Sequence, residues 1–248
     1  MTASAFEAIA AAGDSPLLLL CDHASNRLPP AYGTLGLAAE ALQTHIAYDI
    51  GAAEVTCALA RSYGAAAVLG RWSRLLIDLN RGVDDPTIVM KLSDGSIVPG
   101  NRAVDAAEVA HRIATYHAPY HGAVAREIAR IQAAGAVPIL ISIHSFTPSW
   151  KNVPRPWQFG ILYDRDTRLA KPLMARLAEA GFTVGDNEPY SGALEGDALN
   201  IHGTRRGLPH VLIELRQDLI GDDAAAMAFA GRLKPIIDAA LFDMGRRR

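Results

Sequence analysis

The chain has 248 residues, a mass of 26.4 kDa and a net charge of −2. Such a balanced charge gives no electrostatic reason to expect nucleic acid or an anionic membrane as a partner. No apolar run approaches the roughly 18 residues of a membrane span, the first residues lack the pattern of a signal peptide, and two cysteines do not suggest a disulfide framework. We therefore expect a cytoplasmic protein that forms a single α/β hydrolase domain over residues 1–248.

Apolar runs and helical patterns alternate along the whole chain. The expected strands are residues 17–21, 65–69, 75–78, 137–143, 158–163 and 210–215. The expected helices are residues 49–62, 105–134, 167–181 and 222–245. This alternation predicts an α/β fold with a mostly parallel, mixed central sheet and helices on both faces, which is a three-layer sandwich.

Two of the apolar runs stop at a histidine. LLLLCDHASN places His23 just beyond one strand, and PILISIHS places His144 at the end of another. In open α/β sheets ligands bind at the carboxyl ends of the strands, so we expect both imidazoles to face one crevice. Two imidazoles with a nearby carboxylate are the donors of a catalytic zinc site. The sequence therefore predicts a zinc site, or a site for another divalent metal, and a hydrolase that uses it.

The third metal ligand has more than one candidate. Asp49, in HIAYDIGAAEV, stands near the start of a predicted helix and is our first choice, although it could instead cap that helix. Asn26, three residues after His23, is the rival, but an amide is a poorer zinc ligand than a carboxylate. His45 is a further possibility, as a ligand or as a supporting residue.

Glu214 is the candidate for the proton acceptor. It follows the apolar run Val211–Ile213, where a carboxylate is costly to bury unless it is paired or lines a polar cavity. A base in this position could take a proton from an activated water molecule. The alternative is an ion pair with Arg216 or another arginine.

The segment SRLLIDLNR supplies candidates for substrate binding. The planar guanidinium of Arg81 can bind a carboxylate through two hydrogen bonds, and Asn80 beside it can position that group. Arg74, at the start of the segment, is a second candidate. For either arginine a surface ion pair is the alternative.

His117 and His121 are four residues apart in YHAPYH, so a helix would place them on one face. Pro119 between them predicts a helix start or a kink. For one of the two we expect substrate contact or stabilisation of the transition state, and for the other a structural role.

Five of these motifs, in the same order, resemble the N-formylglutamate amidohydrolase family: CDHASN, SRLLIDLNR, YHAPYH, ISIHSF and IELRQDL. The resemblance covers residues 17–220 and implies a fold related to the zinc carboxypeptidases and the zinc-dependent cell-wall amidases. It also implies zinc bound by His23, Asp49 and His144, with Glu214 as the base and Asn80 and Arg81 as the carboxylate clamp. Where the carboxypeptidase pattern has its acidic ligand, this chain has Asn26.

The activity that this resemblance implies is hydrolysis of N-formyl-L-glutamate, a small molecule, to formate and L-glutamate, and its implied pathway is histidine degradation. Two alternatives remain. One is another zinc hydrolase on the same scaffold, such as a peptidase, a cell-wall amidase or a deacylase of a different N-acyl amino acid. The other is a non-catalytic binding protein.

Overall fold

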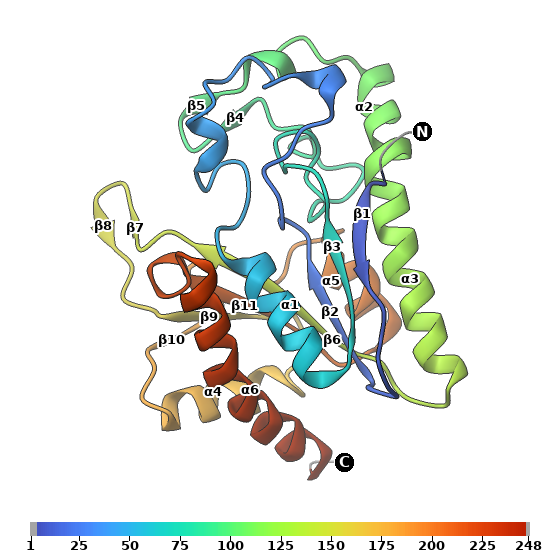
Figure 1. Ribbon diagram of the computed structural model, residues 1–248, viewed down its shortest axis with the longest axis vertical. Helices are drawn as coiled ribbons and strands as arrows, with labels where there is room; N and C mark the ends of the chain where they lie inside the picture. The colour runs from blue at the N-terminus through green and yellow to red at the C-terminus, as the bar shows by residue number, and fades with distance from the viewer. Residues whose placement is uncertain (1–3, 247–248) are drawn as a thin grey trace.

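The computed structural model describes residues 4–246. Its main feature is a seven-stranded sheet (Figure 1). In sheet order the strands are β1 (Phe6–Ile9), β3 (Ala66–Gly70), β2 (Leu17–Cys21), β6 (Ile139–Phe146), β11 (His210–Arg216), β9 (Phe159–Leu162) and β10 (Val184–Asp186). Two short hairpins lie outside this sheet: β4 (Leu92–Ser93) with β5 (Ser96–Ile97), and β7 (Ser149–Trp150) with β8 (Val153–Pro154).

The four strands at the centre, β3, β2, β6 and β11, are parallel to their neighbours within this group. At one edge β1 is antiparallel to β3, and towards the other β9 is antiparallel to β11 while β10 is parallel to β9. The sheet is therefore mixed with a parallel centre, which confirms the predicted fold class. The carboxyl ends of β2, β6 and β11 consequently lie side by side, where these three parallel strands end.

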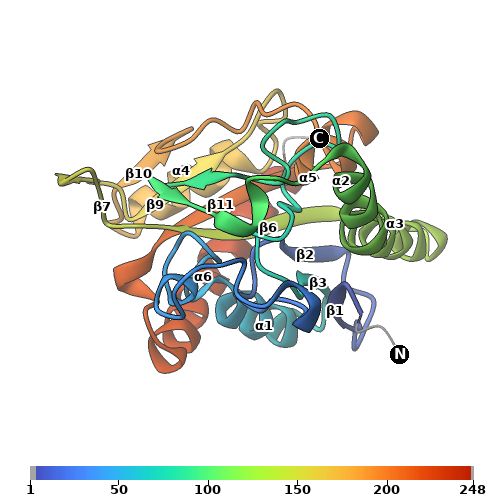
Figure 2. The same ribbon diagram turned by 90° about the horizontal axis from the view of Figure 1, so that it is seen from above.

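Helices cover both faces of the sheet (Figures 1 and 2). The helices are α1 (Ala52–Tyr63), α2 (Ala106–Arg112), α3 (Ala118–Ala133), α4 (Ala170–Glu179), α5 (Ala198–His202) and α6 (Asp223–Arg246). Helices α1, α4 and α6 pack together on one face, and α3 lies across the sheet from α1 and α6. Among residues 4–246, no helix combines the length and the apolar character needed to cross a bilayer.

Alternation along the strands separates two apolar cores. Leu19 and Cys21 on β2, like Ile143 on β6, face α1 and α6. Leu18 and Leu20 face α3. Because successive side chains point to opposite faces, polar residues next to the first set emerge on the α3 face. This face is where the site residues at the strand ends lie.

The predicted strand at residues 75–78 is wrong. Leu75, Leu76 and Ile77 are fully buried, but they lie in a turn and the irregular segment after it rather than in a strand. The side chains of Asn101 and Arg112 donate hydrogen bonds to the carbonyl oxygens of Leu75 and Leu76, at 2.8 and 2.9 Å. These side chains satisfy buried backbone groups that a neighbouring strand would otherwise pair.

The predicted helix at residues 105–134 is interrupted. A π-helical turn, Ile113–His117, separates α2 from α3. Pro119 follows this turn directly, and because it has no backbone N–H to bond to the preceding turn, it accounts for the change in helical hydrogen bonding there. The sequence did not predict β1, β10, α5 or the two hairpins. The other predicted helices and strands are present with small changes at their ends.

Candidate metal centre and active site

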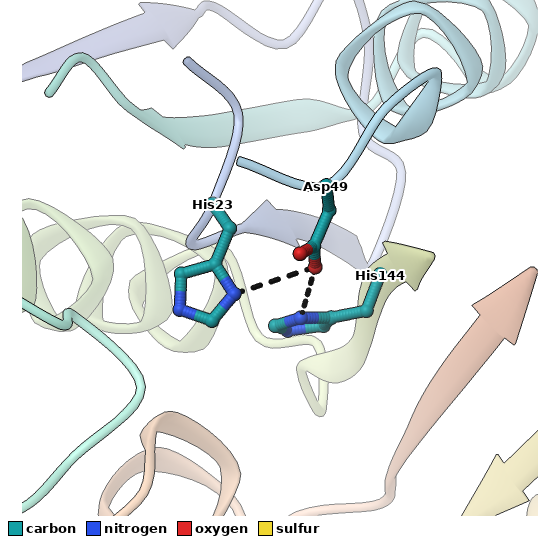
Figure 3. A group of neighbouring side chains, drawn as sticks. All are labelled: His23, Asp49 and His144. Carbon is teal, nitrogen blue, oxygen red and sulfur yellow. Dashed lines mark hydrogen bonds and ion pairs between the residues drawn. The ribbon is translucent and has the colours of Figure 1, made fainter. Parts of the chain in front are cut away.

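His23, Asp49 and His144 meet at the carboxyl end of the central strands (Figure 3). One ligand atom from each lies within 4.8 Å of the others. Asp49 Oδ2 is 2.8 Å from His144 Nδ1 and 3.3 Å from His23 Nδ1. All three residues are buried, and the two rings meet edge to face at a centroid distance of 5.0 Å. The three residues predicted as metal ligands are thus brought together.

The backbone explains this convergence. His144 is the sixth residue of β6, and His23 follows the end of β2, the neighbouring parallel strand. The amide N–H of Asp49 donates to the carbonyl oxygen of His23 at 2.9 Å. The loop from β2 therefore returns to the strand end before α1 begins. Gly51, with φ 78°, caps α1, so Asp49 is not the N-cap of that helix.

Each histidine is also bound by a second buried carboxylate. His23 Nε2 lies 2.7 Å from Asp78 Oδ1, and His144 Nε2 lies 3.0 Å from Asp22 Oδ2. Since a carboxylate accepts hydrogen bonds, each Nε2 donates and each Nδ1 is directed at the shared oxygen of Asp49. Carboxylates in this outer position orient metal-binding histidines and increase their basicity.

The close contacts between buried carboxylates and imidazoles shift the pKa values of the site residues. Burial opposes ionisation of Asp22, but the hydrogen bond from His144 and the charges of both histidines bring its pKa down to about 2. Burial disfavours the charged form of His144, yet its hydrogen bonds to Asp22 and Asp49 raise its pKa well above the usual range. The pKa of Asp78 is well below its usual range for similar reasons: burial raises it, and the charges of His23 and Arg74 outweigh that effect.

The donor chemistry fits a divalent cation. Two imidazole nitrogens and one carboxylate oxygen are the donors of many catalytic zinc sites. Asp22, Asp49 and Asp78 are three buried carboxylates, and Arg74 compensates for one of their charges. Histidines that bind a metal are neutral, and in that state the three carboxylates and Arg74 leave two negative charges, which a divalent cation would balance.

The other candidates for the third ligand lie elsewhere. Asn26 Nδ2 donates to the carbonyl oxygen of Leu42 at 2.9 Å and to the side chain of Gln43 at 3.1 Å. His45 Nε2 is 2.8 Å from Asp94, at a partly exposed position. Both residues stabilise loops, so Asp49 is the candidate whose side chain contacts both histidines.

Glu214 lies directly beside His144. The two residues are partners in the register of β11 and β6, so their side chains emerge on the same face. Glu214 is 6% exposed, and its Oε2 has no hydrogen-bond partner among residues 4–246. Burial, with a smaller contribution from the charge of Asp49, raises its pKa to about 7 although His144 acts in the opposite direction. Arg216 binds Asp218 instead, so the alternative of an ion pair between Arg216 and Glu214 is wrong.

The predicted substrate residues occupy two different settings. Arg74 bridges the site carboxylates, with Nη1 3.3 Å from Asp49 Oδ1 and Nη2 3.0 Å from Asp78 Oδ2. Asn80 accepts a hydrogen bond from the Ala198 amide at 3.0 Å, at the start of α5. Arg81 is partly exposed and donates to the carbonyl oxygen of Asn80. Of the two arginines, Arg81 is thus the one without a hydrogen bond to a site carboxylate.

His117 and His121 bind the backbone of the same loop. His117 Nε2 donates to the carbonyl oxygen of Arg81, and His121 Nε2 donates to that of Leu79, both at 3.0 Å. His117 is the last residue of the π-helical turn, and such turns are frequent at functional sites. The two histidines therefore hold in place the segment of Asn80 and Arg81, which follows Asp78 in the chain.

His121 continues into a pair with His202, a residue that the sequence analysis did not select. His121 Nδ1 is 2.9 Å from His202 Nε2, and the rings are stacked. Since His121 Nε2 donates to a carbonyl, its Nδ1 accepts from His202. Burial lowers the pKa of His121 to about 4 and that of His202 to about 3, so both are neutral at pH 7.

Sequence analysis also missed Asp22 and Asp78. Both carried a signal: each is a carboxylate placed directly after an apolar run, as Glu214 is. Tyr120, on α3, adds a further contact by donating to Asp22 at 2.5 Å.

Comparison with known proteins identifies the family of this chain. Residues 15–221 match the family model described as N-formylglutamate amidohydrolase. An N-formylglutamate deformylase from Pseudomonas aeruginosa is 28% identical over 94% of this chain and 92% of its own length. The crystal structure of an Agrobacterium tumefaciens gene product is similar, with 38% identity, a TM-score of 0.93 and coverage of 98% of this chain and 97% of its own.

A crystal structure of an N-formylglutamate amidohydrolase from Ralstonia eutropha has the same fold, with a TM-score of 0.71 at 22% identity and 98% coverage of both chains. The family model covers most of the chain, including the strand ends that carry the two histidines and Glu214. The chain therefore belongs to the N-formylglutamate amidohydrolase family.

Proposed function

We propose that this protein is a metal-dependent amidohydrolase that converts N-formyl-L-glutamate and water to formate and L-glutamate. The observation that carries the proposal is the position of Glu214. A buried carboxyl group with an unpartnered oxygen lies beside three convergent metal donors. The names of the family and of its Pseudomonas relative supply the substrate.

His23, Asp49 and His144 would hold the metal, and zinc is the ion that suits these donors best. When bound, the ion would polarise the formyl carbonyl group and lower the pKa of a water molecule. Asp22 and Asp78 keep the two imidazoles oriented for this task.

Glu214 is the proposed general base. A pKa of about 7 lets it accept a proton from water and then, as an acid, give that proton to the leaving amine nitrogen as the C–N bond breaks. Its neighbour His144 fixes the distance between this carboxylate and the metal donors through the sheet register.

Arg81 is the proposed clamp for a substrate carboxylate, with Asn80 beside it. Its guanidinium donates to a backbone carbonyl and its Nε lies 3.9 Å from Asp85 Oδ2, which is the surface ion pair kept as the alternative. This contact is long and partly exposed, so an incoming carboxylate would compete with Asp85 for the guanidinium. His117 and His121 position this segment through their hydrogen bonds. Burial lowers the pKa of both histidines, and the single N–H of each neutral ring is used by a backbone carbonyl, so their role in this proposal is to position the segment rather than to contact the developing oxyanion.

The test is formate release from N-formyl-L-glutamate by the purified protein, before and after treatment with a chelator and after addition of zinc. We expect the chelator to abolish formate release and zinc to restore it. Release that survives complete removal of metal would contradict the metal-dependent mechanism. A protein that binds metal but releases no formate would point to a different acyl amino acid, which a panel of N-formyl and N-acetyl amino acids would identify.

A further inference from the structure

Arg155 is a buried arginine whose charge is not paired. It follows β8 and is 9% exposed. Its Nη1 donates to the carbonyl and hydroxyl oxygens of Thr147, at 3.3 and 3.1 Å, and both acceptors are neutral. No carboxylate among residues 4–246 forms an ion pair with it. An unpaired buried charge is costly, so this guanidinium is suited to an anion from outside the chain.

Arg112, which is buried, and Arg74, which is partly buried, show the contrast. Arg112 is 2% exposed, and its Nε lies 2.8 Å from Glu108. Arg74 contacts both Asp49 and Asp78. Each of these cations has a carboxylate partner within the structure, so burial alone does not explain why Arg155 lacks one.

Three aromatic rings surround the guanidinium of Arg155. Its Cζ lies 5.6 Å from the ring centre of Phe146, 5.5 Å from that of Trp150 and 5.3 Å from that of Tyr190. Rings at this distance stabilise the cation through their faces. The hydroxyl of Tyr190 also has a side-chain hydrogen bond with Arg155, but this partner, like Thr147, is neutral. The remaining N–H groups lie in the plane of the guanidinium and can bind a carboxylate at its edge.

The position of Arg155 relative to the metal donors follows from the sheet. Phe146 is two residues beyond His144 on β6, so both side chains lie on the same face, about 7 Å apart along the strand. Tyr190 links Arg155 to the proposed base: burial and the charge of Glu214 raise the pKa of this tyrosine, and the charge of Arg155 lowers it. Arg155 thus lies at the edge of the proposed active site, on the side of β6.

We propose that Arg155 binds a carboxylate in the side chain of the substrate, so that the enzyme selects N-acyl derivatives of dicarboxylic amino acids. This inference rests on the proposed function and adds a residue that determines specificity. Arg81 reaches the site from the segment next to Asp78 and His23, while Arg155 reaches it from the hairpin after His144. Two arginines on separate loops can each take one of two carboxylates.

The experiment compares N-formyl-L-glutamate with N-formyl-L-glutamine, which has nearly the same shape but a neutral side chain. We measure kcat/KM for both substrates with the wild type, Arg155→Met and Arg155→Lys. We expect Arg155→Met to lower the ratio of the two values by about 100-fold, because it removes a charge-assisted pair. Arg155→Lys should keep part of the preference. An unchanged ratio in Arg155→Met would overturn the inference.

A matched control is Arg232→Met. Arg232 also lies over two rings, Phe182 and Phe229, but on the face of the sheet away from the metal donors. Its replacement should leave the ratio unchanged. If Arg155→Met lost activity equally with both substrates, the inference would be overturned and Arg155 would have a structural role. Thermal unfolding of Arg155→Met would then show a loss of stability relative to the wild type.

The two proposals fail in different ways. If the wild type releases no formate from either compound, the proposed function is wrong. Carboxylate binding by Arg155 is then decided by calorimetric titration of glutarate into the wild type and Arg155→Met. Equal affinities would overturn that binding as well, and weaker binding by the variant would support it.

Discussion

The same strands form both faces of the central sheet, but at the strand ends one face carries apolar residues and the other carries polar residues. On the α1 and α6 face, Cys21, Ile143 and Ile213 are fully buried in an apolar core. On the α3 face, the next residues along the three strands are Asp22, His144 and Glu214, which are equally buried but polar. Adjacent residues of one strand therefore belong to different places: one packs in the apolar core, and the next lies in the candidate active site.

The comparison teaches how the sheet can hold so many buried charges. Apolar cores on both faces stabilise the strands and fix their register, and this rigid frame keeps the polar groups at the strand ends of the α3 face in mutual contact. Polar groups on a flexible support would be solvated separately. On these strands they satisfy one another, with a place for a cation between them.

The largest effect is expected from His144→Ala on the polar face. This change removes one of three metal donors, and the loss of metal should lower formate release by roughly 10³-fold or more. Metal content measured by mass spectrometry checks the cause. The adjacent change on the apolar face, Ile143→Val, should cost only about 0.5–1.5 kcal/mol of stability and retain the metal. A His144→Ala protein with full metal content would contradict the assigned site.

The second effect is that of Glu214→Gln. The amide keeps the shape of the side chain but cannot accept the proton, so turnover should fall by roughly 10²–10⁴-fold while metal content is unchanged. Ile213→Val is the matched change on the apolar face and should leave turnover of the folded protein intact. If Glu214→Gln retains its turnover, another group is the base.

A smaller effect is expected from Asp78→Asn. The carboxylate orients His23 through a 2.7 Å contact, and loss of such an outer partner typically weakens metal binding by about 10–100-fold. Competition with a chromophoric chelator measures this affinity directly. Unchanged affinity would show that the polar face tolerates the loss of an individual contact, and the contrast between the two faces would be weaker than proposed.

The smallest effect concerns acid stability. His202 has a pKa of about 3 in the folded protein against about 6.5 in the unfolded chain, so its contribution is complete above pH 6.5 and is lost as the pH falls towards 3. At pH 5 the free energy of unfolding is therefore lower by about 1–2 kcal/mol than it is above pH 6.5. In metal-free protein, urea unfolding of wild type and His202→Asn should therefore differ less at pH 5 than at pH 7. An identical difference at both pH values would exclude this linkage.

Sequence patterns could predict the parts of the site that follow from strand alternation. His144 and Glu214 come directly after apolar residues, His23 comes one residue later, and these apolar runs are strands in the structure. The segment 75–78 has the same apolar character but is not a strand, because Asn101 and Arg112 reach its carbonyl groups from elsewhere. Such side-chain contacts between distant segments leave no local pattern.

The same reason explains what was missed at the site. Arg155 stands in a loop with prolines on both sides, and its unpaired charge becomes evident only when its surroundings are known. His202 belongs to a five-residue helix that is too short to show a periodic pattern. The roles of Asn80, Arg81, His117 and His121 remain predictions, since their contacts in the structure are mainly with the loop backbone.

The metal donors come from three distant parts of the chain, at residues 23, 49 and 144. An unfolded or partly assembled chain has no such site, so metal binding is linked to folding of the central sheet. A metal present at 1,000 times its dissociation constant would add about 4 kcal/mol to the free energy of unfolding. In a cell short of the metal, the proposed site would be empty and the folded protein less stable by that amount, so its abundance as well as its activity would depend on metal supply.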